Sequence, residues 1–299
     1  MQALVKLLGD PGERTVRMVR ERLLQAGPAA LPWVARAASS EPDPVVRGRA
    51  RLLLEEMRFA ELQRRLAHLA SRSDPEFDLE EGLFVVARAR YPELSEEPYR
   101  LRLADMAAEL ARRQIARMSP GEAAAAVNRY LFVEQAFRSN EAHYYDPDNV
   151  CINQVLDRRM GISISLAALY LLVARRAGFA VHGVSLPGRF VIGIPAPAPL
   201  WVDPSRGGRA LSRHDLVAIA REAGHQFDES MLAPVSAREM VARMLAHLMR
   251  VYALTSQAVS AQRLEQLLKI VNRRGAPPDQ GPASSSSRPS SASSEGRPV

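Results

Sequence analysis

The feature of this chain that most restricts its fold is a long apolar run, residues 162 to 174, which lies between Gly161 and Gly178. The run contains serines and is well below the roughly 20 residues that a helix needs to cross a bilayer. We therefore expect a buried helix from about residue 163 to residue 177, ended by Gly178 as its C-terminal glycine cap. Such a helix belongs to the core of a soluble protein.

Three short strands are expected after this helix. They cover residues 180 to 186, 190 to 194 and 200 to 203, and Pro187 and Gly188 form the turn between the first two. The rest of the chain has mostly helical periodicity, with helices predicted in the following segments: 79 to 137 with breaks, 213 to 223 and 237 to 270. A helix followed by antiparallel strands predicts an α+β fold, mostly helical, with a small antiparallel sheet.

The N-terminal residues are expected to form a helical segment of their own. Asp10-Pro11 and Asp43-Pro44 each precede an amphipathic stretch, and Gly27-Pro28 separates two helices between them. This arrangement resembles a HEAT-type repeat. One repeat and a half cannot cover its own apolar face, so we expect this segment to pack on the domain that follows.

Five short motifs surround the predicted buried helix and strands in a fixed order. They read YYDPDN (144–149), NQVL (153–156), RMGISISL (159–166), LPGRF (186–190) and VDP (202–204). In this order and with these gaps they resemble the SirB-type transglutaminase-like family over about residues 130 to 215. The resemblance implies a papain-like fold, in which a nucleophilic cysteine begins a buried helix and a histidine and an aspartate follow on adjacent strands.

The resemblance implies three catalytic positions: Ser163 in place of the cysteine, Arg189 in place of the histidine, and Asp203, where the aspartate is kept. A serine hydroxyl is a weak nucleophile without an adjacent base, and a guanidinium with a pKa above about 12 cannot accept a proton near neutral pH. We therefore expect no nucleophile–base pair here. Arg189 and Asp203 are instead expected to form a salt bridge across their two strands.

These replacements favour a non-catalytic protein that binds a peptide or protein through the former active-site cleft. The residues expected to line this cleft are Tyr145, Asn149, Asn153, Ser163, Arg189 and Asp203. Ser163 is also expected to be the N-cap of its helix, and Asn149 is either an N-cap or a cleft residue. The alternative is a residual cysteine or serine hydrolase, or an acyl transferase, that uses Ser163 or Cys151.

The expected organisation has four parts. A HEAT-like segment covers residues 1–75, the transglutaminase-like core with a helical shoulder covers 76–235, and C-terminal helices cover 236–274. Residues 275–299 are almost entirely Ser, Pro, Gly, Ala and Arg. Such a composition buries too little apolar surface to offset the entropy lost on ordering, so a disordered tail is predicted.

Composition narrows the class of protein further. Cys151 is the single cysteine, which excludes an internal disulfide and a multi-cysteine metal site, and we expect its side chain to be buried. No metal-ligand cluster or cofactor motif is present, so neither a metal nor a cofactor is expected. The N-terminus lacks a secretory signal, which favours a cytoplasmic protein without membrane association. The net charge of +7 comes from arginines interleaved with acids, which indicates a mixed-charge surface and no specific nucleic-acid binding.

Overall fold

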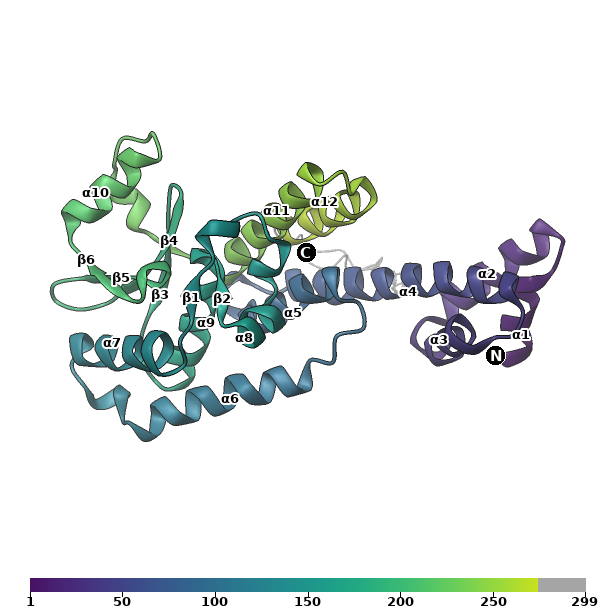
Figure 1. Cartoon of the computed structure of the whole chain (residues 1–299), viewed down its shortest axis with the longest axis horizontal. Coiled ribbons are helices and arrows are strands. Elements are labelled where there is room, and N and C mark those ends of the chain that lie inside the picture. Colours follow the sequence, from purple (N-terminus) through teal and green to yellow (C-terminus); the bar gives the residue numbers. More distant parts are fainter. Residues whose placement is uncertain (274–299) are drawn as a thin grey trace, which may run out of the picture.

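The computed structural model describes residues 1–273 of the chain, and the tail predicted to be disordered lies outside the described residues. Figure 1 shows a small helical unit at the N-terminus and a larger body, joined by the long helix α4 (Pro44–Ala70). The remaining α-helices are α1 (Gln2–Lys6), α2 (Glu13–Ala26), α3 (Leu31–Ser40), α5 (Leu79–Arg90), α6 (Glu97–Arg112), α7 (Pro120–Asn128), α8 (Ile152–Arg158), α9 (Ser163–Arg176), α10 (Arg213–Glu222), α11 (Ala237–Leu254) and α12 (Ala258–Asn272).

The strands form two separate sheets. Strands β1 (Arg138–Ser139) and β2 (Met160–Gly161) make a short parallel pair. The five other strands form one antiparallel sheet in the order β6-β5-β4-β3-β7. Their bounds are β3 (His182–Leu186), β4 (Arg189–Ile194), β5 (Leu200–Asp203), β6 (Arg209–Leu211) and β7 (Pro234–Val235). The predicted α+β class, mostly helical with a small antiparallel sheet, is confirmed.

Helix α4 belongs to two hydrophobic cores. Its N-cap is Asp43, whose carboxylate accepts the N–H groups of Val45 and Val46 at 2.8 and 3.4 Å. Its first half packs with α1, α2 and α3 in a core that includes Val19, Leu23, Val34, Val46, Ala50, Leu53 and Met57. Its second half contributes Leu62, Leu66 and Leu69 to the main core of the larger body. The N-terminal unit is therefore joined to the body by a continuous helix.

Helix α9 is the centre of the larger body, as its apolar sequence predicts. All its residues from Ile164 to Ala174 are buried. At its C-terminus the N–H of Gly178 donates to Arg175 O at 3.0 Å and that of Phe179 to Ala174 O at 2.9 Å, with Gly178 at a φ of 82°. This is a Schellman motif, in which glycine adopts the left-handed conformation without steric cost. The predicted glycine cap is confirmed.

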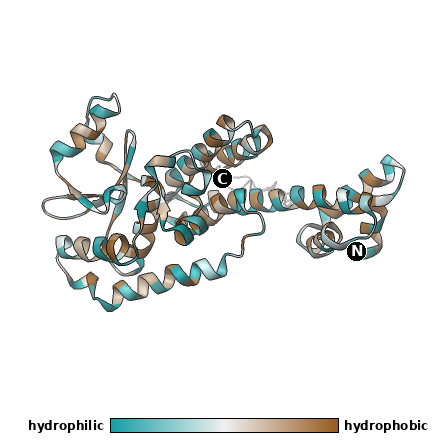
Figure 2. Ribbon diagram, in the orientation of Figure 1, coloured by the Kyte–Doolittle hydropathy of each residue, from teal (hydrophilic) through white to brown (hydrophobic). Residues whose placement is uncertain are grey.

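Both faces of the antiparallel sheet are covered. One face packs on α9 through Phe190, Ile192, Ile194 and Val202, which belong to the main core. The opposite face carries Val184, Leu186 and Val191, which pack with Leu216 and Ile219 of α10. Figure 2 shows helices with an apolar side and a polar side, as is usual where each buries one face.

Two features of the larger body differ from the sequence-based expectation or lie beyond it. The helical stretch predicted from 237 to 270 is interrupted, because α11 ends at Leu254 and Ser256 has a φ of 58° before α12 begins. The short strands β1, β2, β6 and β7 were not expected. Strands β1, β2 and β7 pair with segments distant in sequence, whereas β6 pairs with the preceding strand but has only three residues. Within residues 1–273, no helix is both long and apolar enough to span a bilayer.

Candidate functional site

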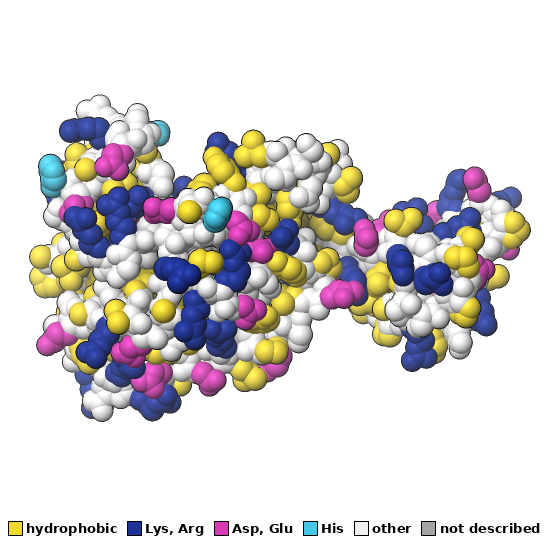
Figure 3. All heavy atoms as spheres, viewed as in Figure 1, with side chains coloured by type: hydrophobic (Ala, Val, Ile, Leu, Met, Phe, Trp, Pro, Cys, Tyr) yellow, Lys and Arg dark blue, Asp and Glu magenta, His cyan; other side chains and the backbone are white. Residues whose placement is uncertain are grey.

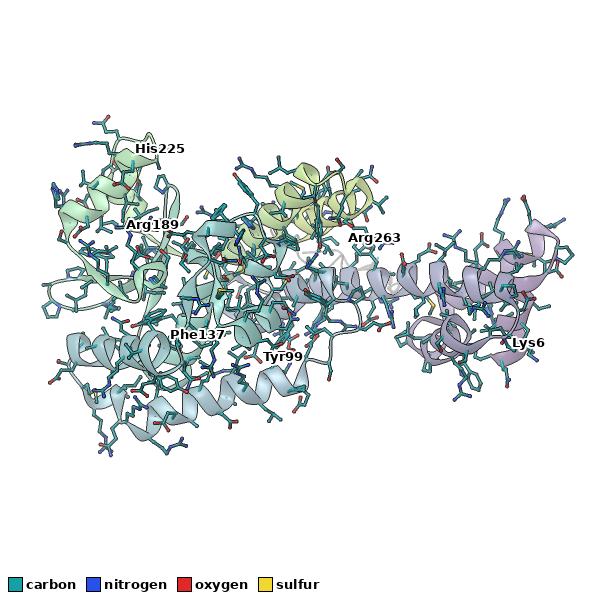
Figure 4. The ribbon with its side chains drawn as sticks, in the orientation of Figure 1. Lys6, Tyr99, Phe137, Arg189, His225 and Arg263 are labelled. Carbon is teal, nitrogen blue, oxygen red and sulfur yellow. The ribbon has the colours of Figure 1, made fainter. Side chains whose placement is uncertain are left out.

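A cavity of about 270 Å³ lies where the N-terminus of α9 meets the start of β4 and one side of α11. It is lined by Tyr144, Ile162, Ser163, Ile164, Gly188, Arg189, Phe190, Arg243, Ala246, His247 and Arg250. Two of the three catalytic positions implied by the sequence, Ser163 and Arg189, are among these residues. Figure 4 labels Arg189 on the sheet, at the start of β4.

Ser163 is not the N-cap of α9, so that prediction is wrong. Ile162 occupies the N-cap position with extended backbone (φ −107°, ψ 173°), and Ser163 is the first helical residue. The helix start is held instead by Ser165, whose Oγ accepts the N–H of Ile162 at 3.0 Å and donates to Asn149 O at 2.5 Å. The Ser163 hydroxyl accepts the N–H of Phe190 at 3.2 Å, which ties α9 to β4.

The predicted ion pair between β4 and β5 is present. Arg189 Nη1 donates to Asp203 Oδ2 at 2.8 Å. Asp203 is fully buried, and its other oxygen accepts the N–H and the hydroxyl of Ser205 at 2.9 and 2.6 Å. Because the guanidinium stays protonated, this pair fixes one wall of the cavity and supplies no base.

Asn149 is neither a helix cap nor part of the cavity wall. It is fully buried, and its amide nitrogen donates to His143 O at 2.8 Å and to Tyr144 O at 3.3 Å. Its Oδ1 accepts a hydrogen bond from Asn140 Nδ2 at 2.9 Å. Asp146, not Asn149, caps the short helix Pro147–Val150. Asn149 therefore holds the loop that presents Tyr144 to the cavity.

The other residues predicted to line the cleft also lie outside the cavity wall. Asn153 and Asp203 are buried in the protein, and Tyr145 is half exposed on the loop, in edge-to-face contact with Tyr144. They lie in motifs next to the site, on a loop, on α8 and on β5, but their side chains are not part of the cavity wall. Of the predicted set, only Ser163 and Arg189 line the cavity.

Cys151 is an unreactive thiol in this structure. It is fully buried, and Sγ donates to Pro147 O at 3.5 Å. Burial raises the pKa of the Cys151 thiol to about 12, so it stays protonated at neutral pH. It does not line the cavity, and it gives no support to a cysteine-based mechanism there.

Helix α11 contributes four cavity residues that sequence reasoning missed, Ala246 and three with polar side chains. Arg243, His247 and Arg250 are four and then three positions apart, so they share one face of the helix. Their spacing is readable in the sequence, but nothing local tells which partner that face contacts. His247 lies edge-to-face with Tyr144 at 5.1 Å, and its Nε2 is buried with no hydrogen-bond partner among the described residues. Burial, and then the charge of Arg250, lower the pKa of His247, which keeps it neutral at pH 7.

The cavity is electropositive. Arg243 and Arg250 form no ion pair with any residue from 1 to 273; each guanidinium lies 5.9 Å from an aromatic ring, those of Phe190 and Tyr145. No Asp or Glu of the described residues lines the cavity. Elsewhere the surface mixes acidic and basic side chains, as Figure 3 shows for one face of both parts of the molecule.

A metal centre is not suggested by the arrangement of side chains. Within the part of the chain that the structure describes, no group of three or more His, Cys, Asp or Glu residues is positioned to hold a metal ion. The cavity residues are arginines, one histidine, one serine and apolar groups, which is a poor donor set for a cation.

Comparison with known proteins identifies the family. The sequence model described as "Transglutaminase-like superfamily" matches residues 97–246, half of the chain. A UPF0162 protein of Xylella fastidiosa (strain Temecula1) is 37% identical over 213 residues, which cover 68% of this chain and 75% of that protein. A UPF0162 protein of Vibrio cholerae is 30% identical over 166 residues, 54% of this chain and 60% of the relative.

A more distant similarity is confined to a short segment. F-box only protein 21 of Mus musculus is 40% identical over 67 residues, which are 22% of this chain and 11% of that protein. No solved structure matches the chain significantly. The matched range 97–246 contains α9, the sheet strands and Arg243, so it includes most of the cavity wall. The chain therefore belongs to the transglutaminase-like superfamily.

Proposed function

We propose that this chain is a non-catalytic transglutaminase-like protein that binds a peptide or protein segment in the cavity at the N-terminus of α9. The observation that carries the proposal is the ion pair of Arg189 with Asp203, 2.8 Å long, at the positions where a family enzyme has its base and orienting acid. A permanently protonated guanidinium cannot accept a proton from a nucleophile. The cavity beside it nevertheless remains open.

The volume and the side chains of the cavity are suited to binding one or two side chains of a peptide. At about 270 Å³ the cavity is close to the lower limit of roughly 300 Å³ for small-molecule sites, which is room for one or two side chains. Ile162, Ile164 and Phe190 give it apolar walls, and Tyr144 lies at its edge with Tyr145 exposed beside it. Apolar and aromatic groups of this kind, next to fixed charges, are common in peptide-binding sites.

The proposal is tested by filling the cavity without changing its charge. Ala246 lines the cavity on α11, whereas Ala253 is exposed on the same helix outside it. We expect Ala246→Phe to lose binding to most members of an array of random 12-residue peptides that the natural protein binds, and Ala253→Phe to retain it. Circular dichroism checks that both variants fold. Unchanged binding by Ala246→Phe would remove the cavity as the site.

A second candidate is a serine hydrolase or acyl transferase with a rearranged base. It is favoured by one observation: His247, neutral and with an unpartnered Nε2, lines the same cavity as Ser163. Against it, the Ser163 hydroxyl is bonded to the N–H of Phe190, and the structure has no hydrogen bond between Ser163 and His247. We expect no labelling by a fluorophosphonate probe. Labelling that disappears in both Ser163→Ala and His247→Gln would favour this enzyme instead.

Several finer assignments belong to the same proposal. We assign the chain to the SirB type, read residues 1–75 as a HEAT-like segment, and place the protein in the cytoplasm. The domain boundaries proposed from the sequence, 1–75, 76–235 and 236–274, are retained with one qualification: α4 contributes to the cores on both sides of the first boundary. A small groove beside the N-terminal unit supports a second interaction surface; it is lined by apolar residues such as Leu24, Leu31 and Met57 and by the charged residues Glu61, Arg64 and Arg88.

A further inference from the structure

The arginines around the cavity differ in whether an acidic side chain neutralises them. Arg189 is neutralised by Asp203. Arg243 and Arg250 line the same cavity, are exposed, and have no carboxylate within 4.0 Å among residues 1–273. His247 between them is held neutral by burial and by Arg250. The cavity therefore carries two uncompensated positive charges, both from α11.

Two acids on the loop beside the cavity are bound to other arginines and do not line the cavity. The loop that carries Tyr144 also carries Asp146 and Asp148, but Arg158 Nη2 donates to Asp146 Oδ2 at 2.6 Å and Arg90 Nε donates to Asp148 Oδ1 at 2.6 Å. Neither acid lines the cavity. The protein thus leaves Arg243 and Arg250 for a ligand although acidic residues are close in sequence to the site.

Further donors around the cavity also favour an anionic group. Helix α9 begins there, and its N-cap, Ile162, has no side chain that can accept the first N–H groups of the helix. The positive end of a helix dipole attracts a carboxylate. Arg189 adds a guanidinium that uses only Nη1 for Asp203. Hydrogen-bond donors thus approach the cavity from three elements, α9, β4 and α11.

The positions of the two free arginines also limit the spacing of the ligand's charges. Arg243 and Arg250 are seven residues apart on α11, which places their Cα atoms about 10 Å apart along the helix axis. A chain in polyproline II conformation rises about 9 Å over three residues and returns its side chains to the same side. Acidic residues three positions apart on such a chain match the two arginines.

We infer that the cavity binds an extended acidic peptide segment, with two carboxylates three residues apart facing Arg243 and Arg250 and an apolar side chain between them against Ile164 and Phe190. The inference rests on the proposed function and adds the ligand's chemistry to it. The electrostatic part is screened by salt, because both guanidinium groups are exposed.

The test uses fluorescence polarisation with the full chain and labelled 12-residue peptides that are acetylated and amidated, so that their ends carry no charge. One peptide has two Glu residues three positions apart in a background of Leu, Ser and Gly, a second has Gln at both positions, and a third has two adjacent Glu residues. We expect the first peptide to bind at least tenfold more tightly than the Gln peptide and more tightly than the adjacent-Glu peptide. Arg243→Gln and Arg250→Gln should each weaken it by about three- to fivefold.

Controls separate the inference from the proposed function. Arg14→Gln removes an exposed arginine of α2, which also lacks an ion pair among the described residues, and should not change binding. Equal binding of the Glu and Gln peptides, lost in Ala246→Phe, would overturn the acid preference while keeping the cavity as a peptide site. Binding of the Glu peptide that survives Ala246→Phe would overturn both.

Three other outcomes would also overturn the inference. No binding of the Glu peptide at 1 mM would exclude an acidic peptide ligand of this spacing. Equal affinity for the adjacent-Glu peptide would remove the assigned spacing. Displacement of the bound peptide by a few millimolar inorganic phosphate, as complete as by unlabelled peptide, would mean that the cavity accepts any anion.

Discussion

Two groups of arginines in this protein lie in opposite surroundings. In the interhelical network, Arg65 and Arg100 bind Glu80, Glu81 and Glu96, with contacts such as Arg100 Nη1 to Glu80 Oε1 at 2.9 Å and Arg65 Nη2 to Glu96 Oε2 at 2.8 Å. The network joins α4, α5 and α6, and Arg176 adds α9 through Glu80. The cavity arginines, Arg243 and Arg250, have no such partner among residues 1–273.

The difference shows that net charge alone says little about function. An excess of +7 is compatible with nucleic-acid binding, with a solvated surface, or with a local anion site. Paired arginines hold helices in place because each guanidinium has fixed acceptors. Unpaired arginines around a cavity have donors available for a ligand. The two groups should therefore respond to mutation in opposite ways, in stability for the network and in binding for the cavity.

The largest effect on stability is expected from Glu80→Ala in the network. Glu80 is buried and accepts hydrogen bonds from Arg100 and Arg176. Its removal leaves Arg176 without an ion-pair partner among the described residues and leaves Arg100 with Glu81 and Glu96. We expect the free energy of unfolding to fall by about 3 kcal/mol. Urea denaturation measures it. Glu93→Ala is the matched control, since its exposed pair with Arg58 should contribute less than about 0.5 kcal/mol.

Arg189→Leu is an intermediate case, because Arg189 belongs to a buried pair and also lines the cavity. The variant leaves Asp203 fully buried, with Ser205 as its remaining hydrogen-bond partner and Arg206 Nε 3.9 Å from its Oδ2. We expect a loss of about 2 kcal/mol in the free energy of unfolding. Arg189→Leu with Asp203→Leu should recover part of that loss in a double-mutant cycle. A change below about 0.5 kcal/mol in the single variant would mean that Ser205 and Arg206 together are enough for the carboxylate.

Acid should weaken the network before it affects the cavity arginines. Burial disfavours the charged form of Glu96, but hydrogen bonds from Arg65 and Arg100 outweigh it and lower the pKa of Glu96 below 4.5. A carboxyl whose pKa is lower in the folded state stabilises the protein above its unfolded pKa, and this contribution is lost as the pH falls through the folded value. Between pH 5 and pH 3, stability should therefore fall more steeply in the natural protein than in Glu96→Gln. Equal slopes would show that the network does not favour the ionised form.

The smallest effect on stability is expected from the cavity arginines. Arg243→Gln together with Arg250→Gln removes two exposed charges that have no partner among the described residues. The free energy of unfolding should change by less than about 0.5 kcal/mol, although binding of the acidic peptide falls at least tenfold. A large loss of stability would show that Arg243 and Arg250 stabilise the fold as the network arginines do, which would contradict the difference between the two groups.

The sequence predicted those parts of the fold that depend on local chemistry. The apolar run with Gly178 at its end gave α9, and the Pro187-Gly188 turn gave the β3–β4 hairpin. The ion pair of Arg189 with Asp203 was also predictable, because both positions lie in motifs whose order fixes adjacent strands.

Predictions failed where a side chain's environment depends on distant segments. The prediction of Ser163 as N-cap was wrong, because Ile162 occupies the N-cap position. The side chain of Ser165 holds the helix start, by accepting the N–H of Ile162 and donating to the carbonyl oxygen of Asn149. Arg243 and Arg250 follow Ser163 by some 80 residues, and only the packing of α11 beside α9 brings them to the same cavity. A helical face can be read from spacing, but not the element that it contacts.

Helix α4 also sets a length. Its 27 residues make an unbroken rod of about 40 Å, anchored in one core at each end. The groove formed by α2, α3 and the middle of α4 is therefore carried on the same rigid helix that enters the core of the larger body. A bivalent ligand that held both this groove and the α11 cavity would need a linker long enough to join them, since a shorter one could not reach and a longer one would lower the effective concentration of its second end.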